Sequence, residues 1–266
     1  MVDDMSVAID LSGKNALLTG GGDGIGKVTA KMLAEAGANV FIGDLNLENA
    51  QKTVEEIKAE FGVKAFCCKC NVASVEDVNA MVDEAVKALG TIDILNNIAG
   101  VSKKVDYMDM TEDVYDMVMD INTKGTFFVD QAVLRVMIPN RKGKIVNMSS
   151  MSGKEGYATN VAYSASKFAV TGITQAVAKY AAPYNINVNA VCPGIVRTQI
   201  WEGLLRQTKE QGGDPDAYWK ERISAIPLQR PQTPEDVARM FVYLSSDFAD
   251  NMTGQGINVT GGLILH

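Results

Sequence analysis

The sequence predicts an α/β fold of the doubly wound type: a single parallel sheet with helices on both faces and a small helical insertion. Short apolar runs alternate with longer segments in which apolar residues recur at helical spacing, as far as the end of the 266-residue chain. A glycine-rich turn, residues 20–26, joins the first apolar run to the first helical segment. Because parallel strands need a crossover, normally a helix, this alternation implies a parallel sheet covered on both faces.

The predicted strands are short and apolar, as in strands buried on both faces. They span residues 15–19, 39–43, 65–70, 92–96, 144–148, 187–191 and 255–259. The predicted helices lie between them and span residues 27–36, 47–61, 75–89, 112–137, 162–182 and 234–245. No polar linker interrupts the series, so we expect one domain over residues 1–266.

One stretch interrupts the alternation. Residues 198–230 contain no strand-like run and hold both tryptophans, Trp201 and Trp219, with turn-forming residues at 212–215. In a compact α/β domain, a connection of this length is more often functional than idle. We expect a lid over a binding site, and the alternative is a surface helical hairpin with aromatic anchors.

Charge and composition exclude several partners. The chain has 25 Lys+Arg and 32 Asp+Glu residues, a net charge of −7, which gives no long-range attraction to nucleic acid or anionic lipid. Asp3 and Asp4 make the N-terminus acidic where a signal peptide would be basic, and no apolar run reaches about 18 residues. We expect a cytoplasmic protein without nucleic-acid or membrane partners.

The single histidine, His266, is the last residue. A Ser-His-Asp hydrolase, a Cys-His protease or a His-ligated zinc enzyme needs an imidazole inside the fold. Cys67, Cys68, Cys70 and Cys192 form no CxxC pair, and adjacent cysteines would point to opposite faces of a strand. We interpret them as small apolar residues in a reducing compartment and expect no metal site.

The glycine-rich turn has the context of a dinucleotide site, because it follows a strand and opens a helix whose N-terminus can receive a pyrophosphate. Its spacing, Gly20-x-x-x-Gly24-x-Gly26, is not G-x-G-x-x-G, and any tight turn favours glycine. Asp44, at the end of the second strand, would bind the ribose hydroxyls and repel a 2′-phosphate. Asp23 acts in the same direction, so both favour NAD over NADP. A helix-capping role is the alternative for Asp44.

Tyr163 and Lys167 lie four residues apart and therefore share one face of a helix. Ser150 follows the strand at 144–148 and faces the same crevice. Most Tyr-x-x-x-Lys pairs are surface residues of a helix, so this pair becomes specific only in combination with other motifs.

The motifs occur together in one order. They are Thr19-Gly20-x-x-x-Gly24-Ile25-Gly26, Asn97-Ile98-Ala99-Gly100, Asn122, Ser150, Tyr163-x-x-x-Lys167 and Pro193-Gly194. In this combination, from about residue 11 to residue 262, the chain resembles the short-chain dehydrogenase/reductase family. The resemblance implies a Rossmann-type fold, a nicotinamide cofactor, and hydride transfer between an alcohol and a ketone. It also implies a homotetramer.

The resemblance also implies roles for single residues. Tyr163 would be the general acid/base and Ser150 a hydrogen-bond donor to the reacting oxygen, while Asn122 would hold a water linking Lys167 to solvent. The implied cofactor contacts are Gly20, Asp23, Gly24, Ile25, Gly26, Asp44, Leu45, Asn71, Val72, Asn97, Ala99, Tyr163, Lys167, Pro193, Val196 and Thr198. Asn71 stands where the family usually has aspartate, and Ile98 where it has a second asparagine.

Proton transfer suits Tyr163, whose ordinary pKa is near 10. A neighbouring cation lowers such a pKa by about 1–3 units, so Lys167 alone can fall short of neutrality. The positive nicotinamide ring would supply the remainder, and we expect a lower tyrosine pKa with oxidised cofactor bound.

Residues 102–107, 151–157 and 198–219 are expected to bound the substrate pocket. The last segment has no basic cluster. Its apolar and aromatic residues are Ile200, Trp201, Leu204, Leu205, Tyr218 and Trp219. Residues 192–202 and 226–231 resemble the branch of acetoin/meso-2,3-butanediol and sorbitol dehydrogenases, and bacterial hydroxysteroid dehydrogenases share this frame. We expect a neutral diol or polyol, with a hydroxysteroid (bile acid) as the alternative.

Two other functions rank lower. An acyl-carrier-protein ketoreductase would favour NADP and a basic docking surface. A non-catalytic NAD-sensing protein on the same fold is disfavoured because Ser150, Tyr163, Lys167 and Asn122 are all present.

Overall fold

Seven parallel strands form a sheet in the order β3-β2-β1-β4-β5-β6-β7 at the centre of the computed structural model, which describes residues 8–266. They are β1 (Asn15–Thr19), β2 (Asn39–Asp44), β3 (Ala65–Lys69), β4 (Ile94–Asn97), β5 (Gly143–Met148), β6 (Ile186–Pro193) and β7 (Gly256–Val259). The strand order reverses between β1 and β4. In an open α/β sheet, ligands bind outside the carboxyl ends of the strands at such a switch point.

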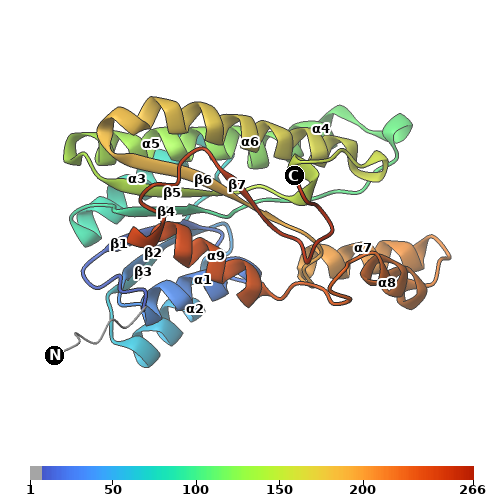
Figure 1. Cartoon of the computed structure of the whole chain (residues 1–266), viewed down its shortest axis with the longest axis horizontal. Helices are drawn as coiled ribbons and strands as arrows, with labels where there is room; N and C mark the ends of the chain where they lie inside the picture. The colour runs from blue at the N-terminus through green and yellow to red at the C-terminus, as the bar shows by residue number, and fades with distance from the viewer. Residues whose placement is uncertain (1–7) are drawn as a thin grey trace.

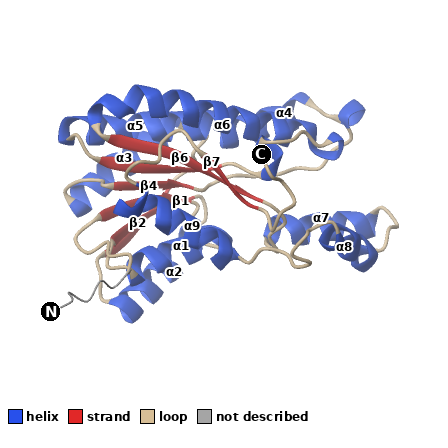
Figure 2. Cartoon of the chain, viewed as in Figure 1, coloured by secondary structure: helices blue, strands red, loops and turns tan. Residues whose placement is uncertain are grey.

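Helices cover both faces of the sheet (Figure 1, Figure 2). One layer contains α1 (Gly24–Glu35), α2 (Leu47–Phe61) and α9 (Pro234–Ser245), and the other contains α3 (Val75–Leu89), α4 (Glu112–Met119), α5 (Gly125–Asn140) and α6 (Val161–Ala181). Successive strand residues point to opposite faces: Leu18 and Ile42 enter one hydrophobic core, Leu17 and Phe41 the other. The predicted doubly wound fold is confirmed.

Helix α1 begins at Gly24, three residues before the predicted start at 27. The reason is a cap that apolar periodicity does not reveal: the Asp23 carboxylate accepts a hydrogen bond from the Gly24 amide at 2.7 Å. The glycine-rich turn therefore leads directly into the first turn of α1.

The single helix predicted over residues 112–137 is divided into three parts. Helix α4 ends at Met119, a π-helical segment spans Asp120–Lys124, and α5 follows. In the π segment, Asn122 Oδ1 accepts from the Val101 amide and its Nδ2 donates to the Val101 carbonyl, both at 2.8 Å. Single π turns inside helices occur frequently at functional sites, and this one ties the helix to the loop after β4.

The insertion forms a helical hairpin, α7 (Gln199–Glu210) and α8 (Pro215–Ser224), beyond the carboxyl end of the sheet (Figure 1). The Trp201 and Trp219 rings meet edge to face at 5.4 Å and pack against a small core that includes Ile195 and Ile226. The predicted lid residue Ile200 lies outside the residues whose side chains are described.

Within residues 8–266, no helix is long and apolar enough to cross a bilayer. Asp3 and Asp4, on which the prediction for the N-terminus rests, lie outside the described residues. The four cysteines are free thiols, and no group of potential metal ligands is found in the described part of the chain.

Candidate active site and dinucleotide cavity

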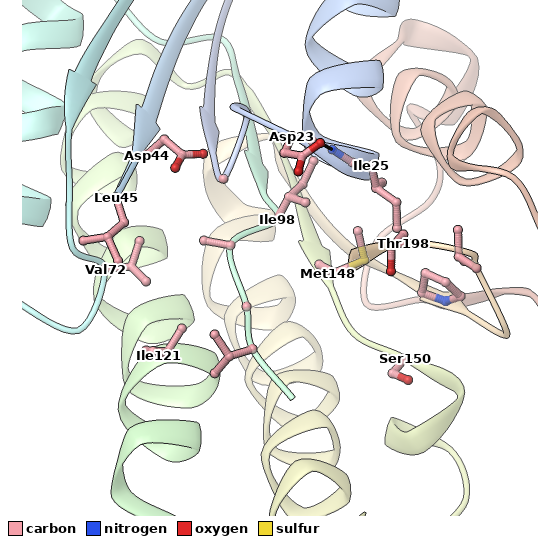
Figure 3. Close-up of a pocket in the computed structure, with 18 of the residues that line it drawn as sticks. Asp23, Ile25, Asp44, Leu45, Val72, Ile98, Ile121, Met148, Ser150 and Thr198 are labelled. Atoms are coloured by element: carbon pink, nitrogen blue, oxygen red, sulfur yellow. Dashed lines mark hydrogen bonds between the residues drawn. The ribbon is translucent and has the colours of Figure 1, made fainter. Parts of the chain in front are cut away.

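A cavity of about 400 Å³ opens at the switch point of the sheet, within the usual size range of small-molecule sites. Nearly all the predicted site residues line it. They are Gly20, Asp23, Gly24, Ile25, Gly26, Asp44, Leu45, Asn71, Val72, Ala99, Ser150, Tyr163, Lys167, Pro193, Val196 and Thr198. Figure 3 shows Asp44, Leu45 and Val72 on one side of this cavity and Thr198 and Ser150 on the opposite side.

The glycine-rich turn forms one wall by close backbone packing. Gly20 has a φ of 72°, and a Cβ there would lie 2.9 Å from the Cα of Ala99. A Cβ on Gly26 would meet the carbonyl oxygen of Gly20. The turn leaves the N-terminus of α1 open to the cavity, where free backbone amides attract a phosphate group. This cradle fits the pyrophosphate of a dinucleotide cofactor.

Asp44 lies at one end of the cavity. Its Oδ2 accepts from the Gly22 amide and its Oδ1 from the Asn46 amide, each at 2.8 Å. The α2 cap is Asn46, so the capping alternative for Asp44 is not observed. Lys69 stands opposite Asp44 in the β2–β3 register and lines a second hollow beside it.

Ser150, Tyr163 and Lys167 meet at the other end. Strand β5 leads into Ser150, and α6 carries Tyr163 and Lys167 on one face. The Lys167 Nζ lies 5.6 Å from the centre of the Tyr163 ring and donates to the Met148 carbonyl at 2.8 Å. Tyr163 shares a hydrogen bond with Ser150.

Burial governs the ionisation of the pair. It raises the pKa of Tyr163, and the hydrogen bond with Ser150 opposes this only in part. Burial also lowers the pKa of Lys167 to about 8, with a smaller opposing effect of Cys192. We expected Lys167 to lower the tyrosine pKa, but burial raises it, and the hydrogen bond with Ser150 is the effect that acts against burial. Tyr163 therefore keeps its proton at neutral pH.

Two predicted residues lie behind the cavity wall. Asn97, expected at the nicotinamide ribose, is buried and bonded to Thr19, Thr126 and Asp130. Asn97 ends β4, and its side chain is directed towards α5. Its contact with the nicotinamide ribose stays a prediction. Asn122 is also buried, and a Cβ on Gly100 would lie 3.1 Å from its Oδ1 and 3.4 Å from Lys167 Nζ.

Comparison with known proteins identifies the family. A family model described as enoyl-(acyl carrier protein) reductase matches residues 20–264. A 3-oxoacyl-(acyl-carrier-protein) reductase from Thermotoga maritima is 38% identical over 255 residues, which cover 96% of this chain and 99% of the relative. The chain belongs to the short-chain dehydrogenase/reductase family. It is therefore an oxidoreductase acting on CH–OH or keto groups with a nicotinamide cofactor.

Solved structures of this family include both cofactor types. NAD+-bound xylitol dehydrogenase has a TM-score of 0.91 and 35% identity, and the match covers 94% of this chain and 99% of that one. NADPH-bound actinorhodin polyketide ketoreductase has a TM-score of 0.89 and 33% identity, with coverage of 94% and 97%. The Thermotoga maritima relative is an acyl-carrier-protein reductase, a class that the sequence analysis places below the polyol enzymes.

This short-chain dehydrogenase/reductase has cavity residues that the motifs did not single out. They are Gly43, Cys70, Val101, Ile121, Met148 and Ser149. Gly43, Cys70, Met148 and Ser149 lie within one residue of the end of a strand, which is the one signal that could have found them. Asp130, bonded to Asn97 and Asn147, was also missed, although a charged residue in the apolar helical stretch 126–137 is a visible anomaly.

Proposed function

We propose that this oxidoreductase interconverts a neutral secondary alcohol and its ketone with NAD, and that the substrate is a small diol or polyol. The observation that carries this proposal is the arrangement along one cavity: Ser150, Tyr163 and Lys167 lie at one end and Asp44 at the other. In this proposal, a single domain binds the cofactor and carries the catalytic residues.

The bound nicotinamide would supply the hydride acceptor or donor. Tyr163 gives its phenolic proton to the ketone oxygen in reduction and takes it back in oxidation. Ser150 donates a hydrogen bond to the same oxygen, and removal of such a donor costs about 2.7–4 kcal/mol of transition-state stabilisation. Lys167 lies beside the Tyr163 ring, where its charge favours the phenolate that forms during reduction. Asn122 holds the loop after β4 through Val101.

The preference for NAD rests on two carboxylates. Asp44 and Asp23 both line the cavity, and a 2′-phosphate near Asp44 would meet a like charge, which costs several kcal/mol when the groups are brought together. Lys69 is the basic residue beside Asp44, and it is exposed.

The cofactor proposal is tested by Asp44→Ser. We expect the ratio of kcat/KM for NAD+ to that for NADP+ to fall by about tenfold or more, because the like-charge repulsion is removed. Glu48→Gln, which removes an exposed acid on α2 outside the cavity, is the control and should leave the ratio unchanged. A wild-type enzyme that prefers NADP+ would overturn the proposal.

The substrate proposal rests on the charge of the cavity wall. Among its described lining residues, the only basic side chain is Lys167, beside the reaction centre, so no second cation is present to bind a substrate carboxylate or phosphate. The likeness to xylitol dehydrogenase points in the same direction.

A 3-oxoacyl thioester is the second candidate, because the Thermotoga maritima relative is named as a reductase of 3-oxoacyl groups on an acyl carrier protein. A nicotinamide absorbance screen decides between the classes. It should compare 2,3-butanediol, acetoin, sorbitol, xylitol, 3-, 7-, 12- and 20-hydroxysteroids, and a 3-oxoacyl thioester, each with both cofactors. Turnover of the thioester with NADPH alone would overturn the polyol proposal, and binding of NADH without turnover of any substrate would favour a sensor.

The partners and compartment belong to the same proposal. Exposed aromatic side chains on α5 and α6, Phe127, Phe168 and Tyr180, support a homotetramer formed through these helices. Light scattering should then give about four times the chain mass of 28.6 kDa. Four free thiols support a reducing, cytoplasmic location. The net charge of −7 supports the absence of nucleic-acid and membrane partners.

A further inference from the structure

Asp130, on α5, is buried beneath the cavity floor and is used by no step described above. It is 1% exposed. Its Oδ2 accepts from Asn147 Nδ2 at 2.9 Å, and its Oδ1 accepts from Asn97 Nδ2 at 3.4 Å. One carboxylate therefore joins the carboxyl ends of β4 and β5, the two strands nearest the reaction centre.

The hydrogen bonds continue from Asn97 to the cavity wall. Asn97 Oδ1 accepts from Thr19 Oγ1 at 2.8 Å. Thr19 Oγ1 in turn accepts from the backbone amides of Ile98 and Ala99, at 3.1 and 3.2 Å. Ile98 and Ala99 line the cavity, and Ala99 is the residue against which Gly20 packs.

On the other side, Asn147 precedes Met148, whose carbonyl accepts from Lys167 Nζ. Asn147 Nδ2 also donates to Thr174 Oγ1 at 3.2 Å, and its Oδ1 has no hydrogen-bond partner. A shift of Asn147 would therefore move the backbone that holds the catalytic lysine.

We propose that Asp130 is a positioning residue: its carboxylate holds the ends of β4 and β5 in the arrangement that binds the dinucleotide, and protonation of Asp130 weakens that binding. The geometry gives the reason. A carboxylate accepts from both amides, whereas a protonated carboxyl turns one oxygen into a donor. If Asn97 turned to accept from it, Thr19 would lose its acceptor. If instead the Asn147 amide rotated so that its Oδ1 accepted from the protonated carboxyl, its Nδ2 would take the present place of Oδ1, where no hydrogen-bond partner is found.

The group titrates in a useful range. Burial raises the pKa of Asp130 to about 7, while the hydrogen bonds from Asn147 and Asn97 act against burial. No charged side chain contributes to this pKa among the described residues. The facing groups are Asn97 from β4, Asn147 from β5 and, through Asn147, Thr174 from α6, and the buried residues of α3 are apolar.

The test is the pH dependence of dinucleotide binding, measured by NADH fluorescence between pH 5.5 and 8.5, or with NADPH if the enzyme prefers it. For the wild type we expect the Kd to be roughly fivefold higher, or more, at the acid end, with a midpoint near 7. Asp130→Asn imitates the protonated form, so it should bind with the weaker Kd at every pH.

Two controls should keep the midpoint. His266→Asn removes the only imidazole in the sequence. Asp83→Asn makes the same chemical change at an exposed acid of α3, outside this network. The inference is overturned if Asp130→Asn keeps the wild-type midpoint or binds as tightly as the wild type at pH 8.5.

A measurement on the wild type alone covers the case in which Asp130→Asn does not fold. If the carboxylate favours binding, NADH binding at pH 6.5 must release protons, and calorimetry in two buffers of different ionisation enthalpy measures them. At this pH Lys167, with a pKa of about 8, already holds its proton. If NADH bound without releasing protons, the inference would be overturned and the proposed function would stand. If neither NADH nor NADPH bound, the proposed function on which the inference rests would be overturned as well.

Discussion

In the proposed reaction, the two directions need opposite protonation states of one side chain. Desolvation raises the pKa of the partly buried Tyr163, so this side chain carries the proton that ketone reduction needs in the proposed mechanism. Alcohol oxidation needs the phenolate, and the positive charge of the bound nicotinamide favours it. The same residue therefore suits both directions, with the cofactor's charge setting its state.

Tyr163→Phe should lower kcat by about 10²–10⁴-fold, because the ring remains but the transferable proton is lost. The Kd for NADH should change little. Tyr180→Phe is the matched control, since Tyr180 lies on the same helix and is exposed. Initial rates and fluorescence titration measure both quantities, and equal kcat values for the two variants would contradict the role.

The pH dependence should differ between the directions. Because the pKa of Tyr163 is raised, the oxidation rate should rise with pH through the alkaline range as more phenolate forms. The reduction rate should fall over that range, and Lys167, with a pKa of about 8, loses its charge there as well. Rates from pH 6 to 10 with each cofactor form measure this, and parallel profiles in both directions would count against it.

Among the elements, the turn between β1 and α1 carries the tightest backbone packing of the site. Gly26→Ala should abolish dinucleotide binding, because the new methyl group would meet the Gly20 carbonyl. Gly172→Ala, inside α6, meets no atom within 4 Å and should instead stabilise the protein by about 0.5–1 kcal/mol. Urea unfolding and NADH titration of both variants measure this contrast, and NADH binding by Gly26→Ala would refute it.

The α7–α8 hairpin is tied to the loop after β4 on the other side of the cavity. Gln207 Nε2 donates to the Lys104 carbonyl at 3.0 Å, and Lys104 Nζ lies 5.3 Å from the Tyr218 ring centre. These contacts hold the hairpin against this loop.

Variants of the two tryptophans distinguish the effect of lining the cavity from the effect of packing within the hairpin. Trp201→Ala should raise the substrate KM by about tenfold, because Trp201 lines the cavity. Trp219→Ala loosens the same ring pair without opening the wall, so its effect on KM should be smaller. Steady-state kinetics with saturating cofactor measures both, and the reverse order would show that lid packing, not cavity lining, sets the KM.

Elements were predictable where apolar spacing alone defines them. Helices at 47–61, 75–89 and 234–245 have the predicted bounds. The π segment at Asn122 was not predictable, because one added residue barely alters the apolar spacing and its cause is a contact with Val101 far along the chain. Helix α8 was not delimited by itself because none of its described residues is buried, which leaves only a weak apolar pattern.

At the scale of the whole molecule, the winding of the chain brings distant motifs to one cavity. Residues after β1, β2, β3, β4, β5 and β6 all line it, which is why motif positions predicted so much of the site. Motif spacing does not say which way a side chain points at a strand end. Asn97 therefore turned out to support the wall from behind, and Asp130, part of no motif, was not predicted at all.

The buried Asp130 carboxyl should also govern the pH dependence of folding. Its pKa is about 7 in the folded protein and about 4 in an unfolded chain. The folded state thus binds more protons between these values, so this group's stabilising contribution is complete below pH 4 and is lost as the pH rises to 7. Between pH 5 and 8 the loss amounts to about 2–3 kcal/mol.

The Asp130→Asn side chain cannot ionise, so this variant should not lose the stability that the wild type loses between pH 5 and pH 8. Its free energy of unfolding relative to that of the wild type should therefore rise by about 2–3 kcal/mol over this range. Urea unfolding of both proteins at the two pH values measures this. Asp77 and Asp236, whose pKa values hydrogen bonds lower, act in the opposite direction but equally in both proteins. The carboxylate form of Asp130, which we propose for dinucleotide binding, is then the form in which the fold is less stable. Its role in the site would explain this loss of stability. If the difference in free energy of unfolding between the two proteins were the same at pH 5 and pH 8, burial would not set the pKa of Asp130.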